Sequence, residues 1–96
     1  MKAPANEFLS TALELVQGDR AKQHGNYIAM HQRVASLWST YLGTNVGAEQ
    51  VAACMMLLKM ARDEHGVYNK DDGIDATAYT ALWASLTSME RDRREQ

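Results

Sequence analysis

The chain of 96 residues has little proline and little cysteine, and each scarcity excludes a class of fold. Its one proline, Pro4, lies near the start, so the rest of the chain is free of the residue that breaks helices most strongly. A single cysteine, Cys54, cannot form an intramolecular disulfide, which excludes a disulfide-stabilised scaffold and fits a reducing compartment.

The chain also lacks a long apolar run and a strong charge of either sign. The longest apolar run, VAACMMLL, is too short to span a bilayer, and the opening residues MKAPANEF contain no apolar segment of a signal peptide. A net charge of −2 provides no general attraction for nucleic acid. We therefore expect a cytoplasmic protein with neither a membrane nor a nucleic acid as its partner.

The residues that are present favour helices. Apolar residues make up 46% of the chain, as in ordinary globular proteins, so a packed core is expected rather than disorder. Ala, Leu, Met, Glu and Gln outnumber Val and Ile, a composition typical of helix rather than sheet. The length fits one domain over residues 1–96, with a loose start at 1–5 and a charged tail at 91–96.

Apolar residues recur at helical spacing in four segments. The periodicity predicts helices over residues 6–16, from 26 or 27 to 42, over 48–65, and from 71 or 72 to about 91. Gly18, Gly43 and Gly66 follow the first three segments, where helices commonly end. The links are short and favour antiparallel neighbours. The expected fold class is all-α, an antiparallel bundle-like domain of four helices.

The segment 48–65 is apolar over much of its circumference. Val51, Met55 and Leu58 form its main seam, and Met56, Leu57 and Met60 broaden it. Such a helix lies at the centre of a bundle or pairs with another chain. We expect a homo-oligomer, most simply a two-fold dimer.

The corner between the last two predicted helices carries two cations and several carboxylates. Lys59 and Arg62 at the end of the third segment are suited to hold a phosphate, Arg62 through its planar fork. Asp71 and Asp75 lie four residues apart on one helix face, and Tyr79 follows one turn later. Carboxylates at this spacing suit Mg²⁺, which prefers oxygen ligands.

The same corner has a structural interpretation. Asp72 at the start of a helix with Asp75 three residues later is typical of capping, and acidic side chains favour that end of the helix dipole. Arg62 is suited to pair with an aspartate of the last helix. We expect a mixed arrangement, in which Arg62 is structural while Lys59 and Asp75 face a cleft. Arg62→Ala should then lower the melting temperature well below the parent, and Asp75→Asn and Lys59→Met should leave it nearly unchanged.

The first loop, GDRAKQHGN, is a second candidate for phosphate binding. It brings Arg20, Lys22 and His24 together beside glycines that allow a ligand to approach the backbone closely. The histidines have no metal-ligand spacing with one another or with Cys54. We therefore expect His31 and Cys54 to be core residues. No nucleotide-binding glycine fingerprint, Walker-type loop or Ser-His-Asp pattern is present.

These residues together resemble a family of small phage and prophage proteins of unknown function. The resemblance covers about residues 12–86 and has the following elements: Gly18-Asp19-Arg20, His24-Gly25, Leu37-Trp38, Tyr41-Leu42-Gly43, Leu58-Lys59, Arg62, and Asp71, Asp75 and Tyr79. It implies a phage protein.

The pattern also resembles the MazG-like all-α nucleotide pyrophosphohydrolases, which are helical and oligomeric and place acids on facing helices around Mg²⁺. The chain departs from that family in having Lys59 and Arg62 where its glutamates would lie. The expected function is therefore binding of a nucleotide or another phosphorylated metabolite, with Mg²⁺-dependent hydrolysis as its catalytic form. The alternative is a non-enzymatic helical interaction protein whose charge cluster is structural.

Overall fold

The computed structural model describes residues 3–18, 26–63 and 66–95, which contain four helices and no strand. The helices are α1 (Ala5–Gln17), α3 (Tyr27–Leu42), α4 (Ala48–Arg62) and α5 (Lys70–Glu95). The all-α class expected from composition and periodicity is confirmed.

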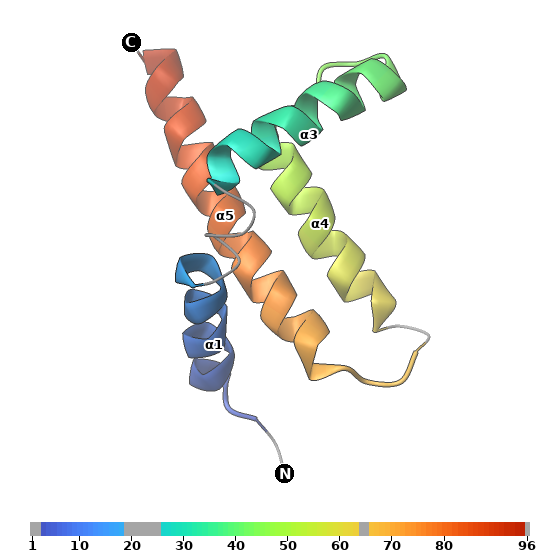
Figure 1. The fold of residues 1–96 in the computed structure, drawn as a ribbon, viewed down its shortest axis with the longest axis vertical. Helices are drawn as coiled ribbons and strands as arrows, with labels where there is room; N and C mark the ends of the chain where they lie inside the picture. The colour runs from blue at the N-terminus through green and yellow to red at the C-terminus, as the bar shows by residue number, and fades with distance from the viewer. Residues whose placement is uncertain (1–2, 19–25, 64–65, 96) are drawn as a thin grey trace.

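The long helix α5 is the centre of the fold. Figure 1 shows α1 and α4 on opposite sides of it, with α3 crossing near the end of α5 that carries the C-terminus. Helices α4 and α5 run antiparallel, because Lys59 lies opposite Asp75 while Met56, earlier in α4, contacts Thr80, later in α5. Helices α4 and α5 are thus antiparallel neighbours, as the sequence predicted, whereas α3 crosses α4 although the link between them is shorter (Figure 1).

Helix α3 begins and ends where its sequence predicts. The side chain of Asn26 accepts a hydrogen bond of 2.8 Å from the backbone N–H of Ile28, which satisfies one free donor of the first turn. At the other end Gly43 adopts a left-handed conformation, with φ of +68°, and donates its N–H to the carbonyl of Ser39. A side chain at this φ would be strained, so the glycine ends the helix.

The turn between α3 and α4 is held by side chains. The Ser39 hydroxyl accepts a hydrogen bond of 2.8 Å from the Val46 N–H, and the Gln50 side chain accepts one of 2.8 Å from the Gly47 N–H. Helix α4 then begins at Ala48, as predicted, and ends at Arg62, three residues before the predicted end. Residues 64 and 65, the end of the predicted segment, lie outside the described residues.

Helix α5 is longer than predicted at both ends. The side chain of Asn69 accepts a hydrogen bond of 3.0 Å from the Asp71 N–H, so Asn69 caps the helix, and the capping role predicted for Asp72 is wrong. Residues 91–95, predicted as a charged tail, continue the helix. Ion pairs from Glu90 to Arg93 and Arg94, three and four residues on, stabilise these last turns.

A close approach of two helices fixes α1 on α5. A Cβ atom built on Gly73 of α5 would lie 3.0 Å from the ring of Phe8, so glycine is the residue that lets this ring approach the helix. Lys70 lies 5.9 Å above the same ring and forms an ion pair with Glu7. These contacts hold the first turns of both helices together.

The core that results is small. Its buried apolar residues are Ala12, Ala35, Val51, Ala52, Ile74 and Leu86. In the described part of the chain no large side chain is fully buried. None of the described helices has the length and apolar character needed to cross a bilayer.

Candidate functional site: the charged corner of α4 and α5

The antiparallel pairing of α4 and α5 brings the last turn of one helix against the first turns of the other. Lys59 Nζ lies 3.1 Å from Asp75 Oδ2 across this contact. Only 17% of the lysine side chain and 16% of the aspartate side chain are exposed, so the pair is largely removed from water. The attraction between the two charges is therefore screened less than it would be on an open surface.

A second ion pair lies one turn nearer the corner. Arg62 Nε is 3.6 Å from Asp72 Oδ1, which confirms the prediction that Arg62 pairs with an aspartate of the last helix. The exposure of the partners is unequal, at 54% for the arginine side chain and 7% for the aspartate side chain. The buried carboxylate lies in the first turn of α5, where the helix dipole favours a negative charge.

The two pairs correct one expectation about the corner. Lys59 and Asp75 were expected to face a cleft, whereas the structure places them against each other between the helices. The cause is the register of α4 on α5. Because the helices run antiparallel, pairing Arg62 with Asp72 also aligns Lys59, three residues earlier, with Asp75, three residues later.

The remaining residues of the predicted metal site lie in different surroundings. Asp71 is exposed at the helix start, whereas Asp75 is turned toward α4. No group of three or more His, Cys, Asp or Glu side chains placed to hold a metal occurs within residues 3–18, 26–63 and 66–95. The phosphate-binding residues predicted in the first loop, Arg20, Lys22 and His24, lie outside the described residues.

Tyr79 belongs to an aromatic contact between α3 and α5. Its ring meets the ring of His31 edge to face, with ring centres 6.4 Å apart. His31 is buried, as predicted, and its Nδ1 lies 2.8 Å from the carbonyl oxygen of Tyr27. Next to this contact the hydroxyls of Tyr27 and Ser85 are 2.8 Å apart. Tyr79 thus helps to seat α3 on α5.

Cys54 is exposed, and the prediction that it is a core residue is wrong. It is exposed although Val51, three residues earlier in α4, is buried. The sequence alone suggested burial because Cys54 is surrounded by methionines and leucines. Several of those neighbours, including Leu57 and Leu58, are themselves exposed.

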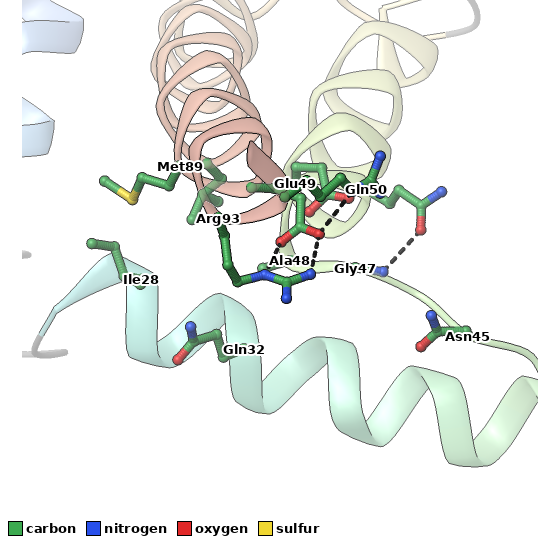
Figure 2. A pocket seen from close by; sticks show the side chains of 12 residues that line it. Ile28, Gln32, Asn45, Gly47, Ala48, Glu49, Gln50, Met89 and Arg93 are labelled. Atoms are coloured by element: carbon green, nitrogen blue, oxygen red, sulfur yellow. Dashed lines mark hydrogen bonds and ion pairs between the residues drawn. The ribbon is translucent and has the colours of Figure 1, made fainter. Parts of the chain in front are cut away.

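A second charged region, not predicted from the sequence, lies where α3, the start of α4 and the end of α5 meet. Figure 2 shows Ile28 and Gln32 of α3 facing Met89 and Arg93 of α5 across a hollow of about 490 Å³. Arg93 binds Glu90 through two nitrogens, at 3.0 and 2.6 Å. These hydrogen bonds lower the pKa of the Glu90 carboxyl to about 2. The charges in this hollow therefore neutralise one another.

The fold is an all-α arrangement around one long helix, and the corner is a set of interhelical ion pairs. The chain belongs to a protein family described as a domain of unknown function, DUF6378, which matches residues 7–87.

Two relatives are phage proteins. The chain is 35% identical over 87 residues to the Gene 55 protein of Mycobacterium phage L5, an alignment that covers 90% of this chain and 56% of that protein. It is 31% identical over 75 residues to the Gene 55 protein of Mycobacterium phage D29, covering 78% of this chain and 50% of that protein. The chain thus spans about half the length of these relatives. No solved structure matches it. The phage family of unknown function expected from the sequence is confirmed.

Proposed function

We propose that this phage-family protein is a non-enzymatic interaction protein, which functions by packing its apolar surface against another polypeptide. The observation that carries the proposal is the extent of that surface. A compact monomer of 10.7 kDa is expected to expose about 5,500 Å², whereas this chain exposes 7167 Å². The radius of gyration agrees, at 14.6 Å against about 12.5 Å for a compact chain of this length.

Much of this surface is apolar. Exposed large apolar residues occur on every described helix and in the link before α5: Leu9, Leu13, Leu37, Tyr41, Leu42, Leu57, Leu58, Met60, Val67, Tyr68, Trp83 and Met89. Single exposed apolar residues are common on monomers, but extended apolar areas mark sites of association. The small core makes the same point, since little of the apolar content is used inside the chain.

The charged corner supports a structural role. Lys59 and Arg62 are each opposed by a carboxylate of α5, so the positive charge that a phosphate would need is already balanced within the corner. Partly buried ion pairs of this kind fix the register of two helices. On this interpretation the corner holds α4 on α5, and function resides in the exposed apolar surface.

A second candidate function is binding of a nucleotide or another phosphorylated metabolite, as the resemblance to MazG-like proteins implies. The observation that favours it is the exposure of Arg62, whose side chain is 54% exposed although its Nε pairs with Asp72. Asp71 and Asp75 would bind Mg²⁺, and Lys59 would add positive charge. The loop residues Arg20, Lys22 and His24 would complete the phosphate site.

Thermal unfolding with a panel of nucleotides, with and without Mg²⁺, discriminates between the two functions. A ligand at a hundredfold excess over its dissociation constant stabilises the folded protein by about 2.7 kcal/mol. We expect no nucleotide to raise the melting temperature. A rise that is lost in Arg62→Met, but kept in the control Arg33→Met on the exposed side of α3, would contradict the interaction function and establish the second candidate.

A further inference from the structure

We propose that the partner is a second copy of this chain, docked on the side of α5 that is turned away from α3. This inference rests on the proposed function and specifies its partner. Its centre is an apolar groove between α1 and α5, here called the α1–α5 groove. The groove is lined by Leu9, Ala12, Leu13, Val16, Thr77, Thr80, Ala81 and Ala84.

The two helices contribute different parts of the α1–α5 groove. Small residues of α5, with Ala81 and Ala84 at the centre, form its floor. The wall is a ridge on α1, where Leu9 and Leu13 lie one turn apart and are 62% and 54% exposed. The hollow measures about 530 Å³, enough to admit large apolar side chains from another helix. The groove is therefore a ridge beside a floor, both apolar.

The floor lies on the side of α5 that its neighbours leave uncovered. Helix α3 contacts α5 through Tyr79 and Ser85. Successive residues of a helix are rotated by roughly 100° about its axis. By this rotation Ala84 points nearly opposite to the direction midway between Tyr79 and Ser85. Figure 1 shows that α1 and α4 occupy the flanks of α5. Gly73, three turns earlier on this side, is covered by the Phe8 ring, so the side is open farther along α5, where Thr80, Ala81 and Ala84 are exposed.

The apolar face continues from the groove onto α4. Thr80 lines the groove and also contacts the Met56 sulfur at 2.8 Å, so this side of α4 adjoins the floor. Met60, one turn after Met56, is exposed, as is Trp83, three residues after Thr80. One apolar face therefore extends over α1, α5 and α4.

The charge of this face fits a second copy of the chain. None of the eight residues that line the groove carries a charge, although the chain as a whole is acidic. In a two-fold dimer the residues near the axis meet their own copies, so a charge there would be repelled by itself. For a strongly charged partner protein, we would instead expect residues of the opposite charge in the lining of the groove.

The shape of the face and the exposed area of the chain as a whole also fit a second copy. Each molecule has both a ridge and a floor, so a two-fold axis can place the leucine ridge of each copy on the small residues of the other. The chain exposes roughly 1,700 Å² more than a compact monomer of its mass. A standard interface covers about 800 Å² per partner, so this excess is sufficient for one.

Light scattering of the full chain over a range of concentrations tests the inference. We expect a dimer, and we expect Leu13→Glu and Ala84→Glu each to raise its dissociation constant by about tenfold or more, because each buries a charge in the interface. Both positions are exposed in the single chain, so the variants should keep their helical circular dichroism. Leu42→Glu is the matched control, an exposed leucine at the end of α3, and should dimerise like the parent.

Cross-linking tests the two-fold arrangement independently, even if a charged variant fails to fold. In a Cys54→Ser background, Leu13→Cys mixed with Ala84→Cys should form a disulfide-linked dimer under mild oxidation, because the ridge of one copy meets the floor of the other, whereas Leu42→Cys mixed with Ala84→Cys should not. A parent that is monomeric at high micromolar concentration would overturn this inference. A dimer lost in Leu42→Glu but kept in Leu13→Glu would overturn it as well. Neither result changes the nucleotide screen, which tests the proposed function separately.

Discussion

At the scale of single residues, the pair of Lys59 and Asp75 differs from the other ion pairs of the chain. Both of its side chains are largely buried, whereas the arginines that pair with Glu90 are mostly exposed. Exposed pairs contribute little because water and salt screen them, while a buried charge that loses an oppositely charged neighbour loses part of its compensation. The position of the pair therefore adds Lys59→Met and Asp75→Asn to the substitutions expected to be damaging, where the sequence predicted only Arg62→Ala.

We now expect Lys59→Met to lower the free energy of unfolding by about 1–3 kcal/mol. The methionine keeps the length of the side chain but removes the positive charge facing Asp75. Urea denaturation measures the change. The control Arg93→Met removes an exposed partner and should cost less than about 1 kcal/mol.

The double variant Lys59→Met/Asp75→Leu checks the cause of that loss. Replacing a buried ion pair by apolar residues is often neutral, because both charges leave together. We therefore expect the double variant to be more stable than Lys59→Met alone. If the losses in free energy of unfolding caused by the two single substitutions simply added in the double variant, Lys59 and Asp75 would behave as two independent surface charges.

The carboxyl of Glu90 provides a prediction about pH. Hydrogen bonds from Arg93 lower its pKa from 4.5 to about 2 in the folded chain. Because the folded pKa lies below the unfolded one, the pair stabilises the fold above about pH 4.5, and this contribution is lost as the pH falls toward 2. A titration followed by NMR should find the Glu90 midpoint well below 4.5. In Arg93→Met the Glu90 midpoint should rise.

At the scale of elements, the start of α5 depends on the side chain of Asn69. This amide accepts the Asp71 N–H, one of the donors that the first turn of a helix leaves free. We expect Asn69→Ala to lower the free energy of unfolding by about 0.5–2 kcal/mol. Asn69→Asp should retain most of the stability, because a carboxylate also caps a helix. Asn45→Ala, in the turn before α4, is the control. Equal losses in the alanine variants would contradict the capping role.

The helices could largely be predicted because their signals are local. Residues 27–42 were predicted as a helix to within one residue, since Asn26 and Gly43 are cap residues within the segment itself. Helix α5 was predicted too short, because its apolar stripe fades after Met89 while the ion pairs of Glu90 extend the helix to Glu95. Where neither periodicity nor a familiar cap marked the boundary, the prediction was several residues short.

The candidate site could be predicted only in part, because its contacts depend on packing between helices. The charge of Arg62 and its position at the end of a helix predicted a pair with an aspartate. Which aspartate it contacts depends on the register of α4 on α5. The pair of Glu7 and Lys70 joins residues 63 positions apart, and no spacing rule predicts it. The exposure of Cys54 likewise depends on how few neighbours surround α4.

At the scale of the whole molecule, the small core and the exposed apolar surface connect the stability of the chain to its association. Figure 1 shows α1, α5 and α4 side by side with α5 in the middle and α3 crossing them. The groove between α1 and α5 has an apolar lining. A chain of this size has a marginal core even when it is compact. Burying this groove in a dimer would add apolar burial at about 25 cal/mol per Å², which links folding to assembly.

This link predicts that the melting temperature depends on protein concentration. If the folded state is a dimer and the unfolded state is a monomer, mass action favours folding as the concentration rises. A tenfold increase in protein concentration favours the folded dimer by about 1.4 kcal/mol. For a dimer of roughly 190 residues, this corresponds to a rise in melting temperature of about 3–6 °C. We expect this rise for the parent and for Leu42→Glu, measured by thermal circular dichroism. Leu13→Glu should rise less across the same range, because its weakened dimer is populated mainly at the higher concentrations. A concentration-independent melt of the parent would mean that the single chain is stable with the α1–α5 groove uncovered.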